Sequence, residues 1–467
     1  MYSYSKEIDR LIEGWRDEII QALRRWISVN SVAGAAEGEG QPYGAEVRAM
    51  LDIAIADARA MGFEANDVDG RVGEVHLGRG EATMGILAHL DVVPAGDGWV
   101  HPPFGGAIED GKLYGRGTSD DKGPAVAALF AMRAVRDAGI ALRDGVRLIL
   151  GCDEEVGMTD MRHYVKVRRM PDYGFSPDAG YPLINLEKGG LGLQLSAAGG
   201  DEDGANIPVY SLWAGERVNV VPALAIAELG VANISLAQLR AALGEGFTVE
   251  GICNGRARVE AHGKSSHGAA PEGGVNAAGK LLIALSKLNA GGGSAGPIAA
   301  LAEKLGMQYD GAGLGIAQRE EKSGPLTCNL GLLRYDGAHL TAQLDIRYPI
   351  GADEADMCGK AVMALSPGGL SVRRLSGRPV YHVPEDHRVV KNLLEVYRDI
   401  TGLPAYTIAI GGGTYSRMMP DTVAFGASFP GDDERAHQPD EYIEIDKLLL
   451  SARIMAHAIE RLAGAKG

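Results

Sequence analysis

The chain has few cysteines, no long apolar run and no basic region at its start. Its cysteines are scattered singly, which fits neither a disulfide framework nor a CxxC metal or redox motif; they are Cys152, Cys253, Cys328 and Cys358. No segment approaches the ~18 consecutive apolar residues of a membrane span, and the charged N-terminus lacks a signal-like apolar stretch. We therefore expect reduced thiols and a cytoplasmic location.

The sequence also lacks an excess of positive charge. Its 46 Lys and Arg residues face 61 Asp and Glu residues, which gives a formal net charge of −15. A chain of this charge repels phosphate backbones and anionic lipid, and no local basic stripe offsets the repulsion. Neither nucleic acid nor a membrane surface is an expected partner. Hydrophobic residues make up 46% of the chain, as in an ordinary globular protein.

Apolar periodicity predicts an α/β fold. Helical spacing occurs from about 5 to 30 and from 44 to 61. A buried strand at 84–90, a helix at 124–139 and a second buried strand at 146–152 then follow one another. This βαβ order favours a doubly wound, mostly parallel sheet with helices on both faces.

The pattern changes after residue 187 and changes back near 383. Alternating strands such as LGLQLSA and ARVEAHG, Gly-rich stretches and a helix near 275–293 suggest an inserted α+β domain. From 383 the helix, strand and turn pattern of the first part resumes and ends in a long final helix. The expected organisation is one domain formed by 1–187 and 383–467, interrupted by an inserted domain at 188–382.

Acidic residues and histidines gather where the predicted strands end. His89 and Asp91 close the strand at 84–90 and share one face of an extended chain. A metal-binding histidine usually donates its second ring N–H to a carboxylate or carbonyl, and Asp91 is within reach. Taken alone, the His-x-Asp pattern is weak evidence for a metal site, because such pairs more often have a structural role.

Two further acidic groups lie near the same predicted edge. Asp120 and Asp121 are adjacent in a Gly-flanked turn before a helix, which is either a cation site or a helix N-terminal acid pair stabilised by the dipole. Glu154 and Glu155 follow the strand at 146–152, where a solvated acidic loop is an equal alternative.

Two more candidate ligands complete the set. Together these residues are stronger evidence for a metal site than each is alone, because they follow one another in order at predicted strand ends and loops. Asp178 stands between Pro177 and Gly180, and His437 lies in a loop before the last helix. Two histidines with several carboxylates at strand ends suit divalent cations of the zinc, cobalt or manganese type.

The motifs together resemble the M20 metallopeptidases, and within them the dipeptidase V subfamily of monomeric bacterial dipeptidases. They run in order over about residues 84–440: HLDVVP, GRGTSDDKGP, CDEEVGM, FSPDAGYPLINLEKG, VNVVP, GKSSHGAAPEGGVNAA, LDIRYP, GGGTYSR and AHQPDE. The resemblance implies a zinc-peptidase-like catalytic domain with an inserted lid, two divalent cations per chain, and a dipeptide substrate. Zinc is the first expectation for the cations, with manganese or cobalt as alternatives.

The resemblance also implies roles for individual residues. His89, Asp120 and Asp178 would hold one cation, and Asp120, Glu155 and His437 the other. Asp91 would be the partner of His89, and Glu154 the general base that takes a proton from a metal-bridging water and passes it to the leaving amine.

The inserted domain would supply the substrate contacts. His267 would stabilise the oxyanion when the lid closes, and Asn219 and Arg347 would contact the substrate, with Arg347 gripping its carboxylate. Backbone N–H groups of Gly412, Gly413 and Thr414 would bind the same carboxylate, although three consecutive glycines are also compatible with a simple turn.

Three functional readings remain open at this stage. The first is a dinuclear dipeptidase acting on unblocked dipeptides. The second is an N-acyl-amino-acid deacylase or desuccinylase of the same family, which the long insertion disfavours because related deacylases generally carry a shorter, dimerising lid. The third is a binding protein that has lost catalysis, which the complete set of expected ligands disfavours. The long insertion also favours a monomer.

Other motifs in the sequence give little evidence for a function. GKSS at 263–266 lacks the upstream glycine of a phosphate loop, since position 258 is Arg258. Ser265 and Ser266 beside His267 lack a GxSxG elbow, so a serine nucleophile is not expected. The remaining histidines have no metal-ligand spacing.

Overall fold

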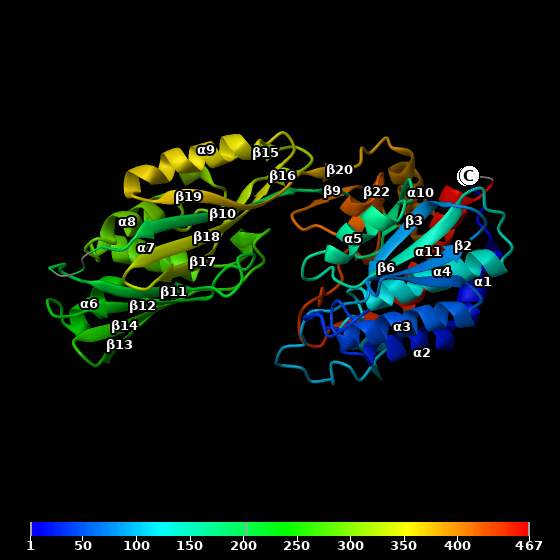
Figure 1. Cartoon of the computed structure of the whole chain (residues 1–467), viewed down its shortest axis with the longest axis horizontal. Coiled ribbons are helices and arrows are strands. Elements are labelled where there is room, and N and C mark those ends of the chain that lie inside the picture. Colours follow the sequence, from blue (N-terminus) through cyan, green and yellow to red (C-terminus); the bar gives the residue numbers. More distant parts are fainter. Residues whose placement is uncertain (1, 201, 203, 466–467) are drawn as a thin grey trace. The chain divides into compact units, whose positions relative to one another are not determined.

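The computed structural model describes residues 2–200, 202 and 204–465. The chain divides into two compact units. Unit 1 contains Met1–Leu186, His382–Ile408 and Gly413–Gly467, and unit 2 contains Glu187–Tyr381 and Ala409–Gly412. The colours of Figure 1 show this interruption, because blue and cyan share unit 1 with orange and red while unit 2 is green to yellow. The 409–412 stretch belongs to unit 2, whereas the sequence analysis placed it in the returning catalytic domain.

Unit 1 is built on a nine-stranded sheet with the order β1-β2-β6-β3-β7-β22-β9-β20, in which β21 also pairs with β9. The strands are β1 (Glu64–Val68), β2 (Val72–Leu77), β3 (Ala82–His89), β6 (Gly145–Gly151), β7 (Tyr173–Ser176), β9 (Ile184–Glu187), β20 (Tyr381–His382), β21 (Ile408–Ile410) and β22 (Thr422–Ala424). Short strands outside this sheet are β4 (Ala107–Glu109), β5 (Lys112–Tyr114), β8 (Ala179–Gly180), β23 (Ala427–Ser428) and β24 (Tyr442–Glu444).

The predicted α/β class is confirmed, and parallel pairing is confined to the sheet centre. β6, β3, β7 and β22 are parallel neighbours. The margins are antiparallel, because β1 and β2 form a hairpin and β2 pairs antiparallel with β6. The sheet is therefore mixed, because the predicted βαβ order describes only its central strands.

Helices cover both faces of the central strands. The helices of unit 1 are α1 (Lys6–Gly14), α2 (Arg16–Ile27), α3 (Ala45–Ala60), α4 (Lys122–Asp137), α5 (Thr159–Val167), α10 (Arg388–Thr401) and α11 (Ile445–Ala463). β3 is buried at nearly every position and β6 at all of them, as expected for strands covered on both sides. Leu87 and Ile149 pack with Met161 and Tyr164 of α5, while α4 contacts both strands and α11 contacts β6 without joining that cluster.

The first predicted helix is interrupted. The sequence analysis expected continuous helical spacing from about 5 to 30, but α1 ends at Gly14 and α2 begins at Arg16. Trp15 lies between them with φ −99° and ψ 14°, outside the helical region. The glycine before it has low helix propensity, so the break occurs at the weakest point of the pattern.

Unit 2 is an α+β unit, as the sequence predicted. Its eight strands follow the order β13-β14-β12-β11-β17-β18-β10-β19, and the neighbouring pairs are antiparallel. They are β10 (Gly189–Ala198), β11 (Val209–Ala214), β12 (Leu224–Gly230), β13 (Phe247–Ile252), β14 (Arg256–His262), β17 (Thr327–Tyr335), β18 (His339–Tyr348) and β19 (Ser371–Arg378); β15 (Arg319–Glu320) and β16 (Gly324–Pro325) form a separate pair.

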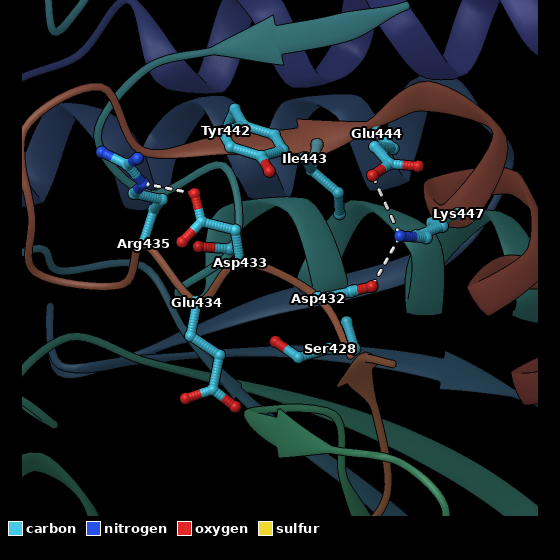
Figure 2. A pocket seen from close by; sticks show the side chains of 11 residues that line it. Ser428, Asp432, Asp433, Glu434, Arg435, Tyr442, Ile443, Glu444 and Lys447 are labelled. Atoms are coloured by element: carbon cyan, nitrogen blue, oxygen red, sulfur yellow. Dashed lines mark hydrogen bonds and ion pairs between the residues drawn. The ribbon is translucent and has the colours of Figure 1, made fainter. Parts of the chain in front are cut away.

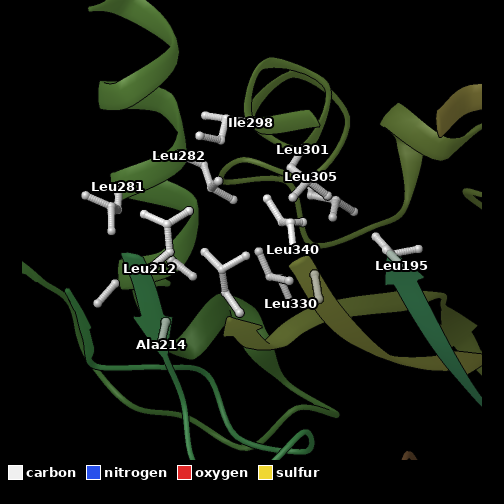
Figure 3. Close-up of a cluster of buried hydrophobic side chains, with 14 of the residues drawn as sticks. Leu195, Leu212, Ala214, Leu281, Leu282, Ile298, Leu301, Leu305, Leu330 and Leu340 are labelled. Carbon is white, nitrogen blue, oxygen red and sulfur yellow. The ribbon is translucent and has the colours of Figure 1, made fainter. Parts of the chain in front are cut away.

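One face of the unit 2 sheet carries its core. The helices α6 (Leu236–Leu243), α7 (Ala277–Lys287), α8 (Ala295–Lys304) and α9 (Glu354–Leu365) contribute to this core. Figure 3 shows leucines of α7 and α8 facing strand residues such as Leu212 and Leu330. Alternate positions of β10 are buried and half-buried, the pattern of a strand covered on one side.

Within the described residues, no helix is long and apolar enough to cross a lipid bilayer. The cytoplasmic location stays a prediction from the sequence.

Candidate metal centre

The carboxyl ends of three parallel strands bring the predicted site residues of unit 1 together. His89 is the last residue of β3, Glu154 and Glu155 follow β6, and Asp178 follows β7. β6, β3 and β7 are adjacent and parallel, so their loops emerge at one edge. In open α/β sheets this edge is where ligands bind.

His89 faces two carboxylates. Its imidazole is fully buried, and Nδ1 lies 3.0 Å from the backbone oxygen of Asp91. Its Nε2 lies 3.0 Å from Asp120 Oδ1 and 3.8 Å from Asp178 Oδ2. The carbonyl fixes the orientation of the ring, and Nε2 is left to face the carboxylates.

His437 reaches the same cluster from the loop between β23 and β24. Its Nε2 lies 2.9 Å from Glu155 Oε1 and 3.1 Å from Asp120 Oδ2. The two oxygens of Asp120 therefore face two different imidazoles. Figure 2 shows the neighbouring part of this loop, where Lys447 pairs with Asp432 and Glu444.

The donor set fits divalent cations. Two groups have possible ligand atoms that all lie within 4.8 Å of one another: His89, Glu154 and Asp178, and His89, Asp120 and Glu155. Imidazole nitrogen and carboxylate oxygen are the ligands that zinc, cobalt and manganese take in proteins. Asp120 connects the two histidines, so the residues suit two neighbouring cations as well as one.

The electrostatics of the cluster are those of crowded acids. Burial and the neighbouring charge of Asp120 raise the pKa of Asp178 to about 6. Hydrogen bonds with Asp120 and Glu155 raise the pKa of His437 to about 10. Burial opposes ionisation of Asp120, but contacts with His437 and His89 hold its pKa well below the usual range. A cation would satisfy the same carboxylates.

Glu154 differs from the other acids in its contacts. Burial, reinforced by the charge of Asp178, raises the pKa of Glu154 well above its usual value. In the described part of the chain its carboxylate has no hydrogen bond from another side chain, while its backbone N–H donates to Asp91 Oδ1 at 3.1 Å.

Asp91 supports the acidic loop as well as His89. Its two carboxylate oxygens accept hydrogen bonds from the backbone N–H groups of Glu154 and Glu155, each at 3.1 Å. Its Oδ1 lies 3.4 Å from His89 Nδ1, farther than its own carbonyl oxygen. The sequence analysis anticipated the proximity to His89 and missed the contact with the loop.

The predicted substrate residues fall into both units. Asn219, His267, Arg347 and Gly412 belong to unit 2, and Gly413 and Thr414 belong to unit 1. Thr414 Oγ1 accepts a hydrogen bond from Ser416 N at 3.1 Å, which begins a short helical turn.

The unit 2 candidates lie close together. Val220, next to Asn219, forms a β-bridge with His267, and Gly268 N donates to the carbonyl of Asn219 at 2.7 Å. Arg347 pairs with Asp345 and donates to the carbonyl of Gly411 at 3.3 Å. Gly268 is also close to Asp345, since a Cβ built on it would lie 2.8 Å from Oδ2.

Of two further buried acids beside the centre, the sequence analysis named Asp121 only as the neighbour of Asp120 and did not name Asp160. Asp121 Oδ2 accepts a hydrogen bond from His89 N at 2.9 Å. Asp160 accepts from Cys152 N at 2.6 Å and from the hydroxyl of Tyr415, so it holds the start of the acidic loop. The paired aspartates offered a signal for Asp121, whereas Asp160 lies on a helix and depends on contacts distant in sequence.

Comparison with known proteins agrees with this geometry. A profile of the peptidase family M20/M25/M40 matches residues 85–461. YtjP of Bacillus subtilis, a predicted dipeptidase, is 36% identical over 459 residues, covering 96% of this chain and 98% of its own. The beta-Ala-Xaa dipeptidase of Lactobacillus delbrueckii subsp. lactis is 32% identical over 463 residues, covering 97% of each chain.

Solved structures share the fold at low identity. Human carnosine dipeptidase 1 aligns with a TM-score of 0.61 at 16% identity and 98% coverage of both chains. The aminopeptidase PepT of Bacillus cereus aligns with a TM-score of 0.56 at 15% identity, covering 96% of this chain and 98% of its own. The family profile spans most of the chain and the relatives cover nearly all of it, so this protein belongs to the peptidase family M20/M25/M40.

Proposed function

We propose that this M20 peptidase is a metal-dependent dipeptidase that hydrolyses the peptide bond of short, unblocked dipeptides. The observation that carries the proposal is the convergence of His89, His437 and several carboxylates at the edge of the parallel strands. The names of two similar proteins, the beta-Ala-Xaa dipeptidase and carnosine dipeptidase 1, support a dipeptide as the substrate.

In this proposal His89, Asp120 and Asp178 hold one divalent cation, and Asp120, Glu155 and His437 hold the other. The position of Asp120 supports a shared ligand, because its oxygens lie 3.0 and 3.1 Å from the two histidines. Zinc is the first candidate, and manganese or cobalt would accept the same ligands. When bound, the cations supply a lowered pKa for a water molecule and polarise the scissile carbonyl.

Glu154 is proposed as the general base. Its carboxylate lies within 4.8 Å of ligand atoms of His89 and Asp178, yet no side-chain hydrogen bond holds it in the described part of the chain. It is therefore available to take a proton from the attacking water and to deliver it to the departing amine. Asp91 supports this role by fixing the backbone at Glu154.

Unit 2 is proposed to recognise the substrate. The imidazole of His267 would donate a hydrogen bond to the oxygen on which negative charge develops, with Asn219 beside it. Arg347, already oriented by Asp345, would bind the free carboxylate of the dipeptide. Backbone N–H groups of Gly412, Gly413 and Thr414 would contact the same carboxylate.

The deacylase alternative requires the same chemistry, and the dipeptidase names of the similar proteins favour the leading proposal over it. We also propose a monomer, because the long inserted unit leaves no need for a partner to complete the site. Light scattering coupled to size-exclusion chromatography measures this state.

The deciding experiment compares kcat/KM for a free dipeptide and its N-acetylated form. The full chain is loaded in turn with zinc, cobalt and manganese, and both an α-linked and a β-alanyl dipeptide are tested. We expect a preference of at least ~100-fold for the free amine, since a site that hydrogen-bonds an ammonium would leave those bonds unmade with the acetylated form. A preference for the acetylated compound would move the protein to the deacylases. Absence of hydrolysis with every metal would overturn the enzymatic proposal.

A further inference from the structure

A buried ion pair lies beneath the metal centre. Glu441 is fully buried, and its Oε2 lies 2.6 Å from Nη1 of Arg116, whose side chain is only 1% exposed. Neither residue has a role in the chemistry proposed above. Burying two charges costs several kcal/mol each unless further hydrogen bonds satisfy them, so the pair calls for a physical account.

The second oxygen of Glu441 organises the loop that carries Asp120. Its Oε1 accepts hydrogen bonds from Gly117 N at 3.1 Å, Ser119 N at 2.9 Å, Ser119 Oγ at 3.0 Å and Asp120 N at 3.2 Å. The backbone oxygen of Glu441 accepts from Gly115 N at 2.9 Å, next to the pairing of β24 with β5. One residue thus accepts from five donors of the seven-residue loop between β5 and α4.

Arg116 extends the same network to the segment after β3. Its Nη2 donates to the carbonyl of Ala95 at 3.2 Å, and its guanidinium lies 5.2 Å from the ring centroid of Trp99. The pair therefore connects the loop of Asp120, the segment that follows His89 and Asp91, and the segment that carries His437.

The His437 segment needs such an anchor because its backbone is strained. His437 and Asp440 have φ of 64° and 53°, in the left-handed region that non-glycine residues rarely adopt. The Asp440 carboxylate accepts from Val100 N and His101 N, and Glu441 follows immediately. The strained turn is thus held at its C-terminal end by two consecutive side chains.

At the other end of the loop the supports are more exposed. Figure 2 shows Lys447 between Asp432 and Glu444, at 2.5 and 2.9 Å. Asp432 in turn accepts from Phe429 N at 2.9 Å. These ion pairs are half-buried, whereas Glu441 and Arg116 are almost fully buried and hold more of the backbone, so Glu441 is the principal anchor of His437.

We propose that Glu441, paired with Arg116, is a positioning residue that sets the spacing between Asp120 and His437 so that both bind one cation. The inference rests on the proposed function, because it deepens the role of the same centre. Glu441 contacts neither histidine and acts through the backbone of the two ligand segments. Residues that orient metal ligands in this way typically change metal affinity by about 10- to 100-fold when replaced.

The test titrates Co²⁺ into the chelator-treated full chain and follows affinity and stoichiometry by calorimetry and visible absorption. In Glu441→Gln we expect two sites, of which one binds about 10- to 100-fold more weakly and has an altered absorption spectrum. At saturating metal kcat should fall at least about tenfold while KM changes less than threefold.

The matched control is Glu74→Gln, which breaks another buried contact with an arginine in unit 1. Glu74 is 4% exposed and lies 3.6 Å from Arg147, on a strand that carries no proposed ligand. This variant should lose stability and keep the Co²⁺ affinities of the wild type. An equal loss of affinity in both variants would overturn the positioning role in favour of general destabilisation.

A milder variant covers the case in which Glu441→Gln fails to fold. Ser119→Ala removes one of the four hydrogen bonds to Oε1 and leaves no unpaired buried charge, so Co²⁺ affinity should fall about fivefold. Unchanged affinity and kcat in a folded Glu441→Gln, or in Ser119→Ala when it alone folds, would overturn the inference. A wild-type chain that binds no cation would instead overturn the proposed function itself.

Discussion

At the scale of single residues, Glu154 and Glu155 show how neighbouring side chains of one type acquire different surroundings. Glu155 contacts His437 at 2.9 Å, whereas the Glu154 carboxylate has no side-chain hydrogen bond in the described residues. Asp91 holds both backbones at 3.1 Å, so the difference arises from where each side chain leaves the loop. In the proposed mechanism Glu155 binds a cation and Glu154 carries a proton.

Replacement of Glu154 by glutamine tests this division. The amide keeps the shape but accepts no proton, so we expect two bound cations and a kcat lower by about 10³-fold. Metal analysis of the purified variant and steady-state kinetics on a dipeptide measure the two quantities. Glu155→Gln is the matched control and should lose affinity for one cation. Turnover close to that of the wild type in Glu154→Gln would exclude the proposed base.

A second residue-scale prediction concerns Glu74 and acid stability. Burial raises the pKa of Glu74, but hydrogen bonds with His76 and Tyr164 and the charge of Arg147 outweigh it and lower the pKa to about 2. Because this lies below the ordinary value of 4.5, ionised Glu74 stabilises the fold. The contribution is complete above about pH 5 and disappears as the pH falls toward 2.

Glu74→Gln should therefore lower the free energy of unfolding by about 2 kcal/mol at pH 7. It should also flatten the loss of stability between pH 5 and pH 2, so the two proteins converge at low pH. Urea unfolding at a series of pH values measures both effects. An identical pH slope in the two proteins would contradict the assignment to Glu74.

At the scale of elements, the contact between β3 and β7 leaves no room for a side chain. A Cβ on Gly174 would lie 1.9 Å from the carbonyl oxygen of Gly85 on the neighbouring strand. These strands lead to His89 and Asp178, so a glycine in β7 sets the spacing of two proposed ligands. The close approach links strand packing directly to the metal centre.

Gly174→Ala should destabilise the protein by about 3 kcal/mol because the strands must separate locally. It should also weaken metal binding, since His89 and Asp178 move with them. Gly14→Ala is the control, because a Cβ on Gly14 meets nothing within 4 Å and alanine favours a helix. Thermal unfolding and Co²⁺ titration compare the two variants. Wild-type stability in Gly174→Ala would refute the packing argument.

Local patterns of the sequence predicted these elements well where the strands are buried on both faces. β3 and β6 appear as continuous apolar runs, and His89 ends β3 while Glu155 lies in the loop that follows β6. Local patterns failed to predict features that depend on contacts between residues far apart in the sequence. The antiparallel pairing of β2 with β6 and the burial of Glu441 against Arg116 depend on neighbours far away in sequence.

At the scale of the whole molecule, the proposed site residues are divided between two compact units. The metal-ligand candidates belong to unit 1, while Asn219, His267 and Arg347 belong to unit 2. Sequence motifs identified both groups by resemblance, but the division of 411–414 between the units depends on packing that no local pattern records. A residue in unit 2 should therefore affect turnover without affecting metal content.

His267→Ala tests this separation. Loss of a single oxyanion donor should lower kcat by about 10²-fold and leave two cations bound. His262→Ala is the control, because the imidazole of this exposed histidine of the same unit forms a hydrogen bond with Thr248 Oγ1, and the variant should keep full activity. Kinetics and metal analysis on the same samples give both readouts. Loss of a cation in His267→Ala would make His267 a metal ligand.

The strand order of unit 1 has a consequence for synthesis of the chain. β22 (Thr422–Ala424) lies between β7 and β9, which are made more than 200 residues earlier. Unit 2 is almost complete when its last long segment ends at Tyr381, whereas the sheet of unit 1 still lacks a central strand. A growing chain emerges from N- to C-terminus, so the edges of β7 and β9 that pair with β22 stay unpaired until residues 422–424 are made. His437 emerges later still, so the proposed metal centre stays incomplete until residue 437 has been made.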